Sequence, residues 1–197
     1  VLADEIYEHI NYIGKHESIA QFEGMKERSI IVNGVSKAYA MTGWRIGFIA
    51  APQWIVKGCN KLQGQYTSGP CSVSQKAAEA AYTLPQNCVE TMRQAFERRR
   101  DLIVSLAKEI PGLEVNKPEG AFYLFPKCSS FFGKTDGQRT INNSTDFAMY
   151  LLEVGHVATV GGDAFGDPDC FRMSYATSDD NIKEAMSRIK NALSLLK

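Results

Sequence analysis

Residues 34–47 constrain the fold most, because a lysine and an arginine lie there among glycines and apolar residues. The stretch reads Gly-Val-Ser-Lys-Ala-Tyr-Ala-Met-Thr-Gly-Trp-Arg-Ile-Gly and follows an apolar run at residues 29–32 that predicts a buried strand. Lys37 therefore lies just past a strand end in apolar surroundings, where desolvation disfavours its charged form and favours amine chemistry. Arg45 lies between two glycines, which suits an anionic group that approaches the backbone closely.

The length and charge of the chain argue against several classes of protein. Its 197 residues can bury one sizeable core, or one core and part of another. Lys and Arg together number 22, as do Asp and Glu, so no global field attracts nucleic acid or an anionic membrane. No apolar run reaches the roughly 18 residues that span a bilayer, and no signal peptide is visible. We therefore expect neither a nucleic-acid partner nor a membrane partner.

The cysteines and histidines predict neither disulfides nor a metal site. The five cysteines are odd in number and widely spaced, without a Cys-x-x-Cys pair, which argues against a disulfide framework or a zinc site. The three histidines show no ligand spacing, so we expect lone histidines and no bound metal. A reducing cytoplasm is the simplest setting for such a chain.

A pair of polar residues, Asp4 and Tyr7, follows residues 1–3, which predict the tail of a short buried strand. Ligand groups collect at the carboxyl ends of strands in open α/β sheets, so Asp4 is a candidate site residue. The alternative is that Asp4 only caps the following turn, as aspartate often does. The sequence alone leaves both interpretations open.

The remaining patterns predict an α/β piece, a long helix and a smaller α+β piece. Helical spacing predicts helices at residues 53–66 and 85–110 and a final amphipathic helix that Ser178 caps. An alanine-rich run predicts a helix at residues 72–83, and we expect a short helix at residues 145–153. Short apolar runs predict strands at residues 29–33, 45–51, 113–115, 121–125, 157–160 and 171–175. We place a boundary near residue 111, where Pro111-Gly112 stops the long helix.

Two further motifs have structural interpretations. The arginine triplet at residues 98–100 interrupts the apolar stripe of the long helix without basic or aromatic support nearby, so we predict a solvated face. Gly161 and Gly162, with Gly166, resemble a phosphate cradle only weakly, because no strand-loop-helix context surrounds them. We predict a tight turn there.

The stretch around Lys37 resembles the lysine signature of the class I aminotransferases, which use pyridoxal phosphate. All the positions that the family restricts match, at Gly34, Ser36, Lys37, Ala40, Met41, Gly43, Arg45, Ile46 and Gly47. The run Ala-Met-Thr-Gly-Trp-Arg-Ile-Gly is similar to the bacterial-type aspartate aminotransferase branch. The Asp-x-x-Tyr at Asp4 and Tyr7 and residues 120–123 and 171–176 also resemble family motifs in the family's order, so the resemblance covers essentially the whole chain.

The resemblance implies an α/β fold, namely the C-terminal half of a fold type I pyridoxal-phosphate-dependent transferase. Residues 1–84 would form the C-terminal part of the large cofactor-binding domain, with an incomplete sheet. Residues 85–110 would form a long interdomain helix, and residues 111–197 a small α+β domain. The chain starts at Val1 without a methionine, which also indicates a fragment.

The resemblance also implies a role for each candidate residue. Lys37 would attach to the aldehyde of pyridoxal 5'-phosphate and then act as the general base, while Asp4 would pair with the pyridine nitrogen. Tyr7 would hydrogen-bond the ring hydroxyl, and Arg45 would bind the phosphate. Arg172 would clamp the substrate α-carboxylate in the two-pronged geometry that arginine provides. The alternatives stay open that Lys37 is an ordinary loop lysine, that Arg45 pairs with a structural carboxylate, and that Arg172 forms an interdomain ion pair.

Some parts of the family's site are missing from this chain. The family's glycine-rich phosphate loop, its asparagine for the ring hydroxyl and its ring-stacking aromatic precede the Asp-x-x-Tyr motif, at which this chain begins. At position 34 many relatives place a serine that reaches the phosphate, which Gly34 cannot do. We therefore expect weak or no cofactor binding and no turnover from this chain alone.

The implied function is that of an enzyme of amino-acid metabolism. It would move an amino group from aspartate or a related amino acid to 2-oxoglutarate or another 2-oxo acid, as a cytoplasmic homodimer when full length. One alternative is another enzyme of the same fold, such as an aromatic or alanine aminotransferase or a lyase. The other is the aminotransferase-like effector domain of a transcription regulator. A panel of amino acids would separate the enzymes, and an upstream helix-turn-helix would indicate the regulator.

Overall fold

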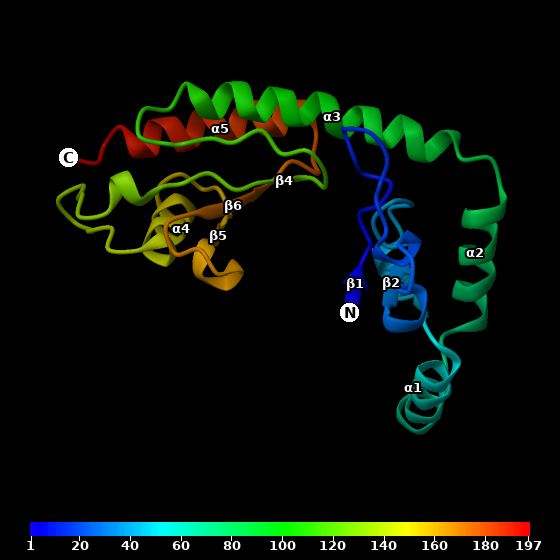
Figure 1. Ribbon diagram of the computed structural model, residues 1–197. Helices are drawn as coiled ribbons and strands as arrows, with labels where there is room; N and C mark the ends of the chain where they lie inside the picture. Colours follow the sequence, from blue (N-terminus) through cyan, green and yellow to red (C-terminus); the bar gives the residue numbers. More distant parts are fainter. The chain divides into compact units, whose positions relative to one another are not determined.

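The computed structural model describes residues 1–197 and divides into two compact units, Val1–Gln94 and Ala95–Lys197. The division lies within one long helix, α3 (Asn87–Lys108), which confirms the helix predicted at residues 85–110 (Figure 1). The finer predicted division at residues 84 and 110 stays a prediction.

A three-stranded sheet organises the first unit. Its strands are β1 (Leu2–Asp4), β2 (Ile30–Gly34) and β3 (Gly47–Ala50), in the order β1-β2-β3. β1 runs parallel to β2, and β3 runs antiparallel to β2. The carboxyl ends of β1 and β2 and the start of β3 therefore lie at the same edge of the sheet. Residues that follow β1, follow β2 or precede β3 converge at this edge.

Two glycines, Gly34 and Gly47, face each other across β2 and β3 at this edge. A Cβ atom at Gly34 would lie 3.0 Å from both the Gly47 Cα and the Ile46 carbonyl oxygen. A Cβ atom at Gly47 would lie 3.0 Å from the Asn33 carbonyl oxygen. Glycine at both positions therefore allows this close approach of the strands without displacing the backbone.

The segment between β1 and β2 is irregular, as predicted, and includes two short 3-10 helices, Ile19–Gln21 and Lys26–Arg28. The buried carboxylate of Glu5 ties this segment to the end of β1. It accepts a hydrogen bond from the Ser18 hydroxyl at 2.7 Å and lies 3.1 Å from His16 Nε2. Because a buried carboxylate needs such partners, the pairing orders the chain beside the sheet edge.

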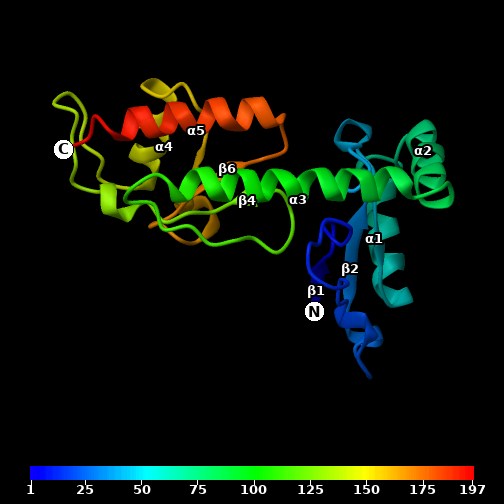
Figure 2. The same ribbon diagram turned by 90° about the horizontal axis from the view of Figure 1, so that it is seen from above.

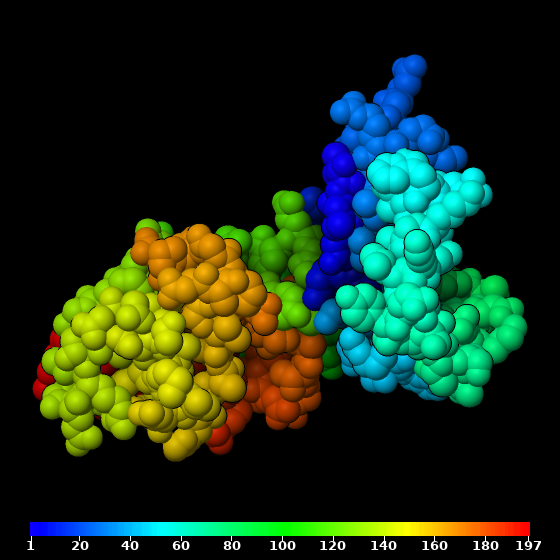
Figure 3. Space-filling view, turned by 90° about the horizontal axis from the view of Figure 1, so that it is seen from below, coloured from blue at the N-terminus to red at the C-terminus, as the bar shows by residue number.

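Two helices of the first unit, α1 (Gln53–Tyr66) and α2 (Ser72–Thr83), confirm the helices predicted at residues 53–66 and 72–83. No residue of α1 is buried. Trp54 is 75% exposed and Tyr66 is 83% exposed. Figure 3 shows the cyan α1 segment uncovered at the surface. Trp54, one of the apolar residues whose spacing predicts α1, is therefore exposed to solvent.

The sequence predicts a buried strand at residues 1–3, and the predicted burial is wrong. β1 forms, but Val1 and Leu2 are exposed. β1 is the edge strand of its sheet and contacts mainly β2. The apolar run therefore predicted the strand correctly but not its burial, because burial depends on what packs against a strand and not on its composition.

A second three-stranded sheet organises the second unit. Its strands β4 (Tyr123–Leu124), β6 (Phe171–Ser174) and β5 (Val160–Gly161) pair antiparallel in the order β4-β6-β5. In Figures 1 and 2, α5 (Asp179–Leu193) and the adjoining part of α3 lie side by side over one face of this sheet. α4 (Ser144–Glu153) packs beside β5.

The core of the second unit is aromatic and closed. Phe147 and Phe171 are 0% exposed, and their ring centroids lie 4.8 Å apart. Tyr150 is buried too, and its hydroxyl donates to the Ala192 carbonyl oxygen at 3.0 Å. The Tyr150 hydroxyl therefore has a hydrogen-bond partner inside the core.

Capping side chains set the starts of both helices of this unit that follow α3. The Asn143 side chain accepts a hydrogen bond from the Asp146 N–H at the start of α4. The Ser178 hydroxyl accepts one from the Asn181 N–H at the start of α5, which confirms the predicted cap. Each cap satisfies a backbone donor that the helix itself leaves unpaired.

The short strands of the second unit are where the sequence predictions fail most. Residues 113–115 form no strand, and Glu114 makes only an isolated bridge to Lys127. β4 occupies two of the residues predicted at 121–125, and β5 begins at Val160, the last residue of the run predicted at 157–160. Pairing with β6 selects which residues become strand, and a short apolar run does not carry that information.

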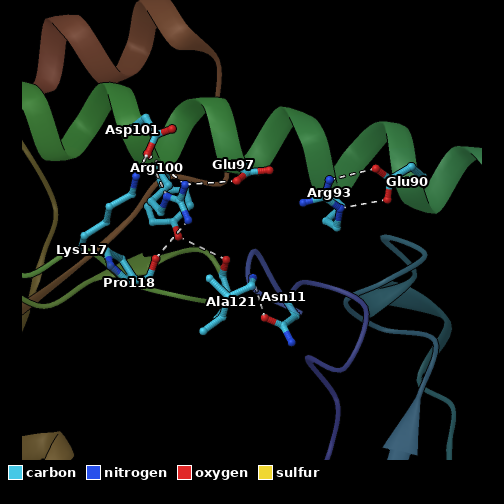
Figure 4. A network of polar contacts seen from close by, with 11 residues as sticks. Asn11, Glu90, Arg93, Glu97, Arg100, Asp101, Lys117, Pro118 and Ala121 are labelled. Carbon is cyan, nitrogen blue, oxygen red and sulfur yellow. Dashed lines mark hydrogen bonds and ion pairs between the residues drawn. The ribbon is translucent and has the colours of Figure 1, made fainter. Parts of the chain in front are cut away.

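The arginine triplet at residues 98–100 is not a uniformly solvated face. Arg100 is 4% exposed, so the prediction is wrong for this residue. Its guanidinium lies 3.3 Å from Glu97 and 3.0 Å from Asp101, and it donates to the Pro118 carbonyl oxygen at 3.4 Å (Figure 4). A buried charge requires partners of this kind, and helical spacing brings Glu97 beside Arg100.

The other two arginines of the triplet join α3 to α5. Arg98 and Arg99 each lie 3.2 Å from the carboxylate of Asp179, in the first turn of α5. Arg98 holds the pKa of Asp179 below its usual range, with Arg99 assisting. The triplet therefore has a structural role.

No helix of the structure combines the length and apolarity needed to cross a membrane. No group of three or more histidine, cysteine, aspartate or glutamate side chains is arranged to hold a metal ion.

Candidate active site

A pocket of about 530 Å³ opens at the sheet edge where β1 and β2 end and β3 begins. Three of the predicted site residues line it, namely Asp4, Lys37 and Arg45. The other lining residues are Ile6, Val32, Asn33, Gly34, Ser36, Thr42, Ile46 and Gly47. The strand order explains the convergence, because the parallel pair and the antiparallel return bring these loops to one edge.

The loop after β2 holds Lys37 in this pocket. Lys37 lies three residues past the end of β2, and its neighbours Val35 and Ala38 are buried and anchor the loop. Lys37 Nζ lies 5.8 Å from the centroid of the Tyr7 ring, over its face. Tyr7 does not line the pocket itself, but this contact places its ring beside the amine.

Tyr39 fastens the same loop to helix α2 and to the segment that follows it. Its hydroxyl donates to Gln86 Oε1 at 2.8 Å, and its ring meets the Tyr82 ring edge-on at 5.3 Å between centroids. Burial raises the pKa of Tyr39 and raises that of Tyr82 to about 12, so both rings stay neutral near physiological pH. The buried residues of the lysine loop and the contact of Tyr39 with α2 therefore both fix the position of this loop.

Asp4 has both of the roles that the sequence left open. Its Oδ1 accepts a hydrogen bond from the Ile6 N–H at 3.2 Å, so it does cap the following turn. It also lines the pocket. A carboxylate can accept several hydrogen bonds, so this cap leaves acceptor capacity for a ligand.

Arg45 lies in a left-handed backbone conformation, with φ of 52° and ψ of 52°, at the end of a short 3-10 helix (Thr42–Trp44). Its Nη1 donates to the Thr42 carbonyl oxygen at 2.8 Å. This hydrogen bond orients the side chain, and its acceptor is a neutral main-chain oxygen instead of the structural carboxylate considered as the alternative. A guanidinium has five N–H donors, so most of them stay available for an anion.

Three polar residues of the pocket escaped the sequence reasoning as site residues: Asn33, Ser36 and Thr42. Asn33 is buried and doubly held, because its Oδ1 accepts from the Gly34 N–H and its Nδ2 donates to Glu8 Oε1, each at 2.7 Å. A polar residue at the end of an apolar strand is the signal that would have found Asn33.

Arg172 lies in the second unit, whereas the other four predicted site residues lie in the first. It is part of β6, the middle strand of its sheet. Its guanidinium carbon lies 4.4 Å from the centroid of the Tyr123 ring and 4.2 Å from that of Phe165. Within its unit, Arg172 therefore contacts aromatic rings instead of a carboxylate.

The predicted tight turn precedes Phe165. A Cβ atom at Gly162 would lie 2.0 Å from the Asp167 carbonyl oxygen and 2.3 Å from that of Cys170, so only glycine fits. Gly166 has a φ of 83° and caps the 3-10 helix Gly162–Phe165 in the left-handed region that favours glycine. The turn is confirmed.

The sequence matches the family described as aminotransferase class I and II over residues 1–189. The chain is 50% identical to the bifunctional aspartate aminotransferase and glutamate/aspartate-prephenate aminotransferase of Petunia hybrida, over 100% of the chain and 42% of that protein.

Solved structures of aminotransferases resemble the fold. The crystal structure of the aspartate aminotransferase from Rhizobium meliloti matches with a TM-score of 0.94 and 47% identity, covering 100% of this chain and 50% of that one. The aromatic aminotransferase from Pyrococcus horikoshii OT3 matches with a TM-score of 0.87 and 40% identity, covering 98% of this chain and 50% of that one. The predicted α/β fold, part of a pyridoxal-phosphate-dependent transferase, is confirmed.

This chain spans about half the length of the curated relatives it matches. The match to the family nevertheless runs through both units, from β1 into the final helix α5. The chain belongs to the class I and II aminotransferase family.

Proposed function

We propose that this chain contributes the lysine-bearing part of the active site of a pyridoxal-phosphate-dependent aminotransferase that moves an amino group from aspartate to a 2-oxo acid. The observation that carries the proposal is the pocket of about 530 Å³ shared by Asp4, Lys37 and Arg45, with the Tyr7 ring beside the amine. An amine, a carboxylate and a guanidinium at one sheet edge match the aldehyde, ring nitrogen and phosphate of that cofactor.

The residues present fit the cofactor by their chemistry. Arg45 would hold the phosphate, because its guanidinium is oriented by Thr42 and keeps further donors. Asp4 would hold a proton on the ring nitrogen, and Tyr7 would hydrogen-bond the ring hydroxyl. Once bound, the cofactor supplies an electron sink for the substrate α-carbon. Lys37 Nζ would remove the α-carbon proton and return one during transfer, as a general acid–base group.

The relatives favour aspartate as the amino donor. The Rhizobium meliloti relative is an aspartate aminotransferase, 49% identical over 98% of this chain and 48% of that protein. The name of the Petunia hybrida relative adds prephenate as an oxo acid, so prephenate is a second candidate acceptor for this chain. An aromatic amino donor is a further candidate, because the Pyrococcus horikoshii structure is of an aromatic aminotransferase.

Two further expectations belong to this proposal. The exposed apolar side chains of α1 support burial against more chain, so we propose a homodimer in the complete protein. All five cysteines are unpaired, which supports a reducing, cytoplasmic setting.

Chemical trapping of the lysine tests the proposal. The chain is co-expressed with the part of the Rhizobium meliloti aspartate aminotransferase that it does not match. The pair is incubated with pyridoxal phosphate, reduced with borohydride, and digested for mass spectrometry. We expect the reduced adduct to concentrate on the peptide that carries Lys37, and to disappear from it in Lys37→Ala. Lys57 lies exposed on α1, so Lys57→Ala is the matched control and should leave the Lys37 adduct unchanged. Labelling spread evenly over exposed lysines, with no preference for Lys37, would contradict the proposal.

A further inference from the structure

We propose that Tyr123 and Phe165 are positioning residues that hold the Arg172 guanidinium ready for a substrate carboxylate. The inference rests on the function proposed above, because it concerns how Arg172 would recognise the amino-acid substrate. All three residues lie in the second unit, on β4, on β6 and at the end of the 3-10 helix Gly162–Phe165.

Two aromatic rings hold the guanidinium. Its carbon lies over the Tyr123 ring at 4.4 Å from the centroid and over the Phe165 ring at 4.2 Å. Rings that stack on a guanidinium occupy its faces and leave its in-plane N–H groups for hydrogen bonds. Those in-plane groups form the fork that binds a carboxylate with two parallel hydrogen bonds.

The surrounding structure fixes both rings. Tyr123 pairs with Ser174 in the β4–β6 ladder, and its ring centroid lies 4.8 Å from that of Phe122. The Phe165 ring meets the Phe125 ring at 6.0 Å with an interplanar angle of 89°. The turn before Phe165 is locked, because the Gly162 N–H donates to the Cys170 carbonyl oxygen at 2.8 Å.

Phe165 is 44% exposed. Burial therefore does not account for a large aromatic side chain at this position. The contact with Arg172 does account for it, because a ring must stand at the surface to stack on a guanidinium that a ligand can reach.

The other arginines of the second unit show what is different about Arg172. Each of them pairs with a carboxylate: Arg98 and Arg99 with Asp179, Arg100 with Glu97 and Asp101, Arg139 with Asp136 and Glu153, and Arg188 with Glu184. A carboxylate of the protein would compete with a substrate carboxylate for the same N–H groups. Aromatic rings orient the guanidinium without occupying that edge or neutralising its charge.

Titration with a carboxylate tests the proposal without the cofactor. The full chain, labelled with ¹⁵N on arginine, is titrated with succinate while the Arg172 Nε–Hε resonance is followed by NMR. In the parent chain we expect saturable binding and an upfield ring-current shift of this resonance. Tyr123→Leu and Phe165→Leu should each weaken binding about two- to fivefold and reduce the shift, since each removes one cation–π contact.

The controls separate positioning from folding. Tyr123→Phe keeps the aromatic ring, so its affinity for succinate should equal that of the parent chain. Phe132→Leu removes a half-buried aromatic of the same unit that lies outside the Arg172 contacts, and it should leave binding unchanged. Circular dichroism checks that each variant folds.

The outcomes distinguish this inference from the proposed function. Parent affinity and an unchanged Arg172 shift in folded Tyr123→Leu and Phe165→Leu variants would overturn the positioning role. An absence of saturable binding in the parent, or binding that survives in Arg172→Leu, would overturn the carboxylate role of Arg172. Neither readout depends on Lys37 or on pyridoxal phosphate, so a failure of the lysine trapping is a separate result.

Discussion

The two units use apolar side chains in opposite ways. In the second unit, Phe147 and Phe171 are completely buried and Tyr150 satisfies its hydroxyl inside the core. In the first unit, no residue of α1 is fully buried, and Trp54, Leu62 and Tyr66 stand exposed. The helical periodicity that predicts α1 is of the same kind as the one that predicts α5, whose residues Ile182, Met186, Ile189, Ala192 and Leu193 are buried.

The second unit carries a core of its own, whereas the first leaves the apolar side chains of α1 exposed. Contiguous exposed apolar surface on a soluble protein marks a contact with another chain segment or subunit. The lysine pocket belongs to the unit that leaves these apolar side chains exposed. The following predictions test that contrast.

The largest effect concerns turnover. We expect no transamination by the 197-residue chain alone, and activity when it is co-expressed with the part of the Rhizobium meliloti aspartate aminotransferase that it does not match. Lys37→Ala in the complemented pair should lower kcat by about a hundred- to ten-thousandfold or more, because the acid–base group is lost. Aspartate-dependent formation of an amino acid from a 2-oxo acid is the measurement. Full activity of the isolated chain would show that the first unit is complete as it stands.

Thiol reactivity should differ between the units by about a thousandfold. Cys59, Cys71 and Cys88 are exposed, whereas Cys128 and Cys170 are buried. Burial raises the pKa of Cys128 to about 12 and that of Cys170 to about 11, so the reactive thiolate is scarce at pH 8. Mass spectrometry after iodoacetamide treatment should find the three exposed thiols alkylated first. Rapid native alkylation of Cys128 would mean that the second unit is not closed.

The same experiment has a pH dependence within the first unit. Backbone amides of Ser74 and Val73 at the start of α2 stabilise the thiolate and lower the pKa of Cys71. A lower pKa leaves more thiolate as the pH falls, so alkylation of Cys71 should persist to lower pH in the folded chain than in the denatured chain. Denaturation in guanidinium chloride is the control, since it should make all five thiols react alike.

Paired deletions compare the two surfaces directly. Phe147→Ala should lower the free energy of unfolding by about 3 to 5 kcal/mol, because it leaves a cavity in a closed core. Trp54→Ala should change it by less than about 0.5 kcal/mol, because its side chain is 75% exposed. Urea unfolding followed by circular dichroism measures both. A comparable loss from Trp54→Ala would place that side chain in a buried contact.

The smallest effect concerns the ion pairs of Arg98 and Arg99 with Asp179. Asp179→Asn should lower the melting temperature slightly at pH 7, and the difference should shrink in high salt. The folded-state pKa of Asp179 is lowered by Arg98 and then by Arg99. Its stabilisation is therefore present above the unfolded-state pKa of about 3.9 and is lost as the pH falls through the lower folded-state value. An undiminished difference at strongly acidic pH would contradict this origin.

The helices and the core of the site could be predicted from local sequence. Helix positions follow from a period of three to four residues over many turns, and α1 and α3 form where that period indicates. α2 forms where the sequence is rich in alanine. Lys37 and Arg45 are eight residues apart on one glycine-rich loop, so a short motif carries both. Asp4 was recognisable because it stands at the carboxyl end of an apolar run, and the parallel pairing of β1 with β2 brings it to the same edge.

The tertiary structure decided the rest, because burial and pairing depend on neighbours that are distant in sequence. Residues 113–115 and 157–160 have strand-like composition, but their backbone pairing partners determine which residues become strand. Arg100 is buried because Pro118 and two carboxylates satisfy its guanidinium, which no run of arginines reveals. The Arg172 guanidinium meets the Tyr123 and Phe165 rings only because β4, β6 and the turn before Phe165 fold together. No local sequence pattern predicts these contacts.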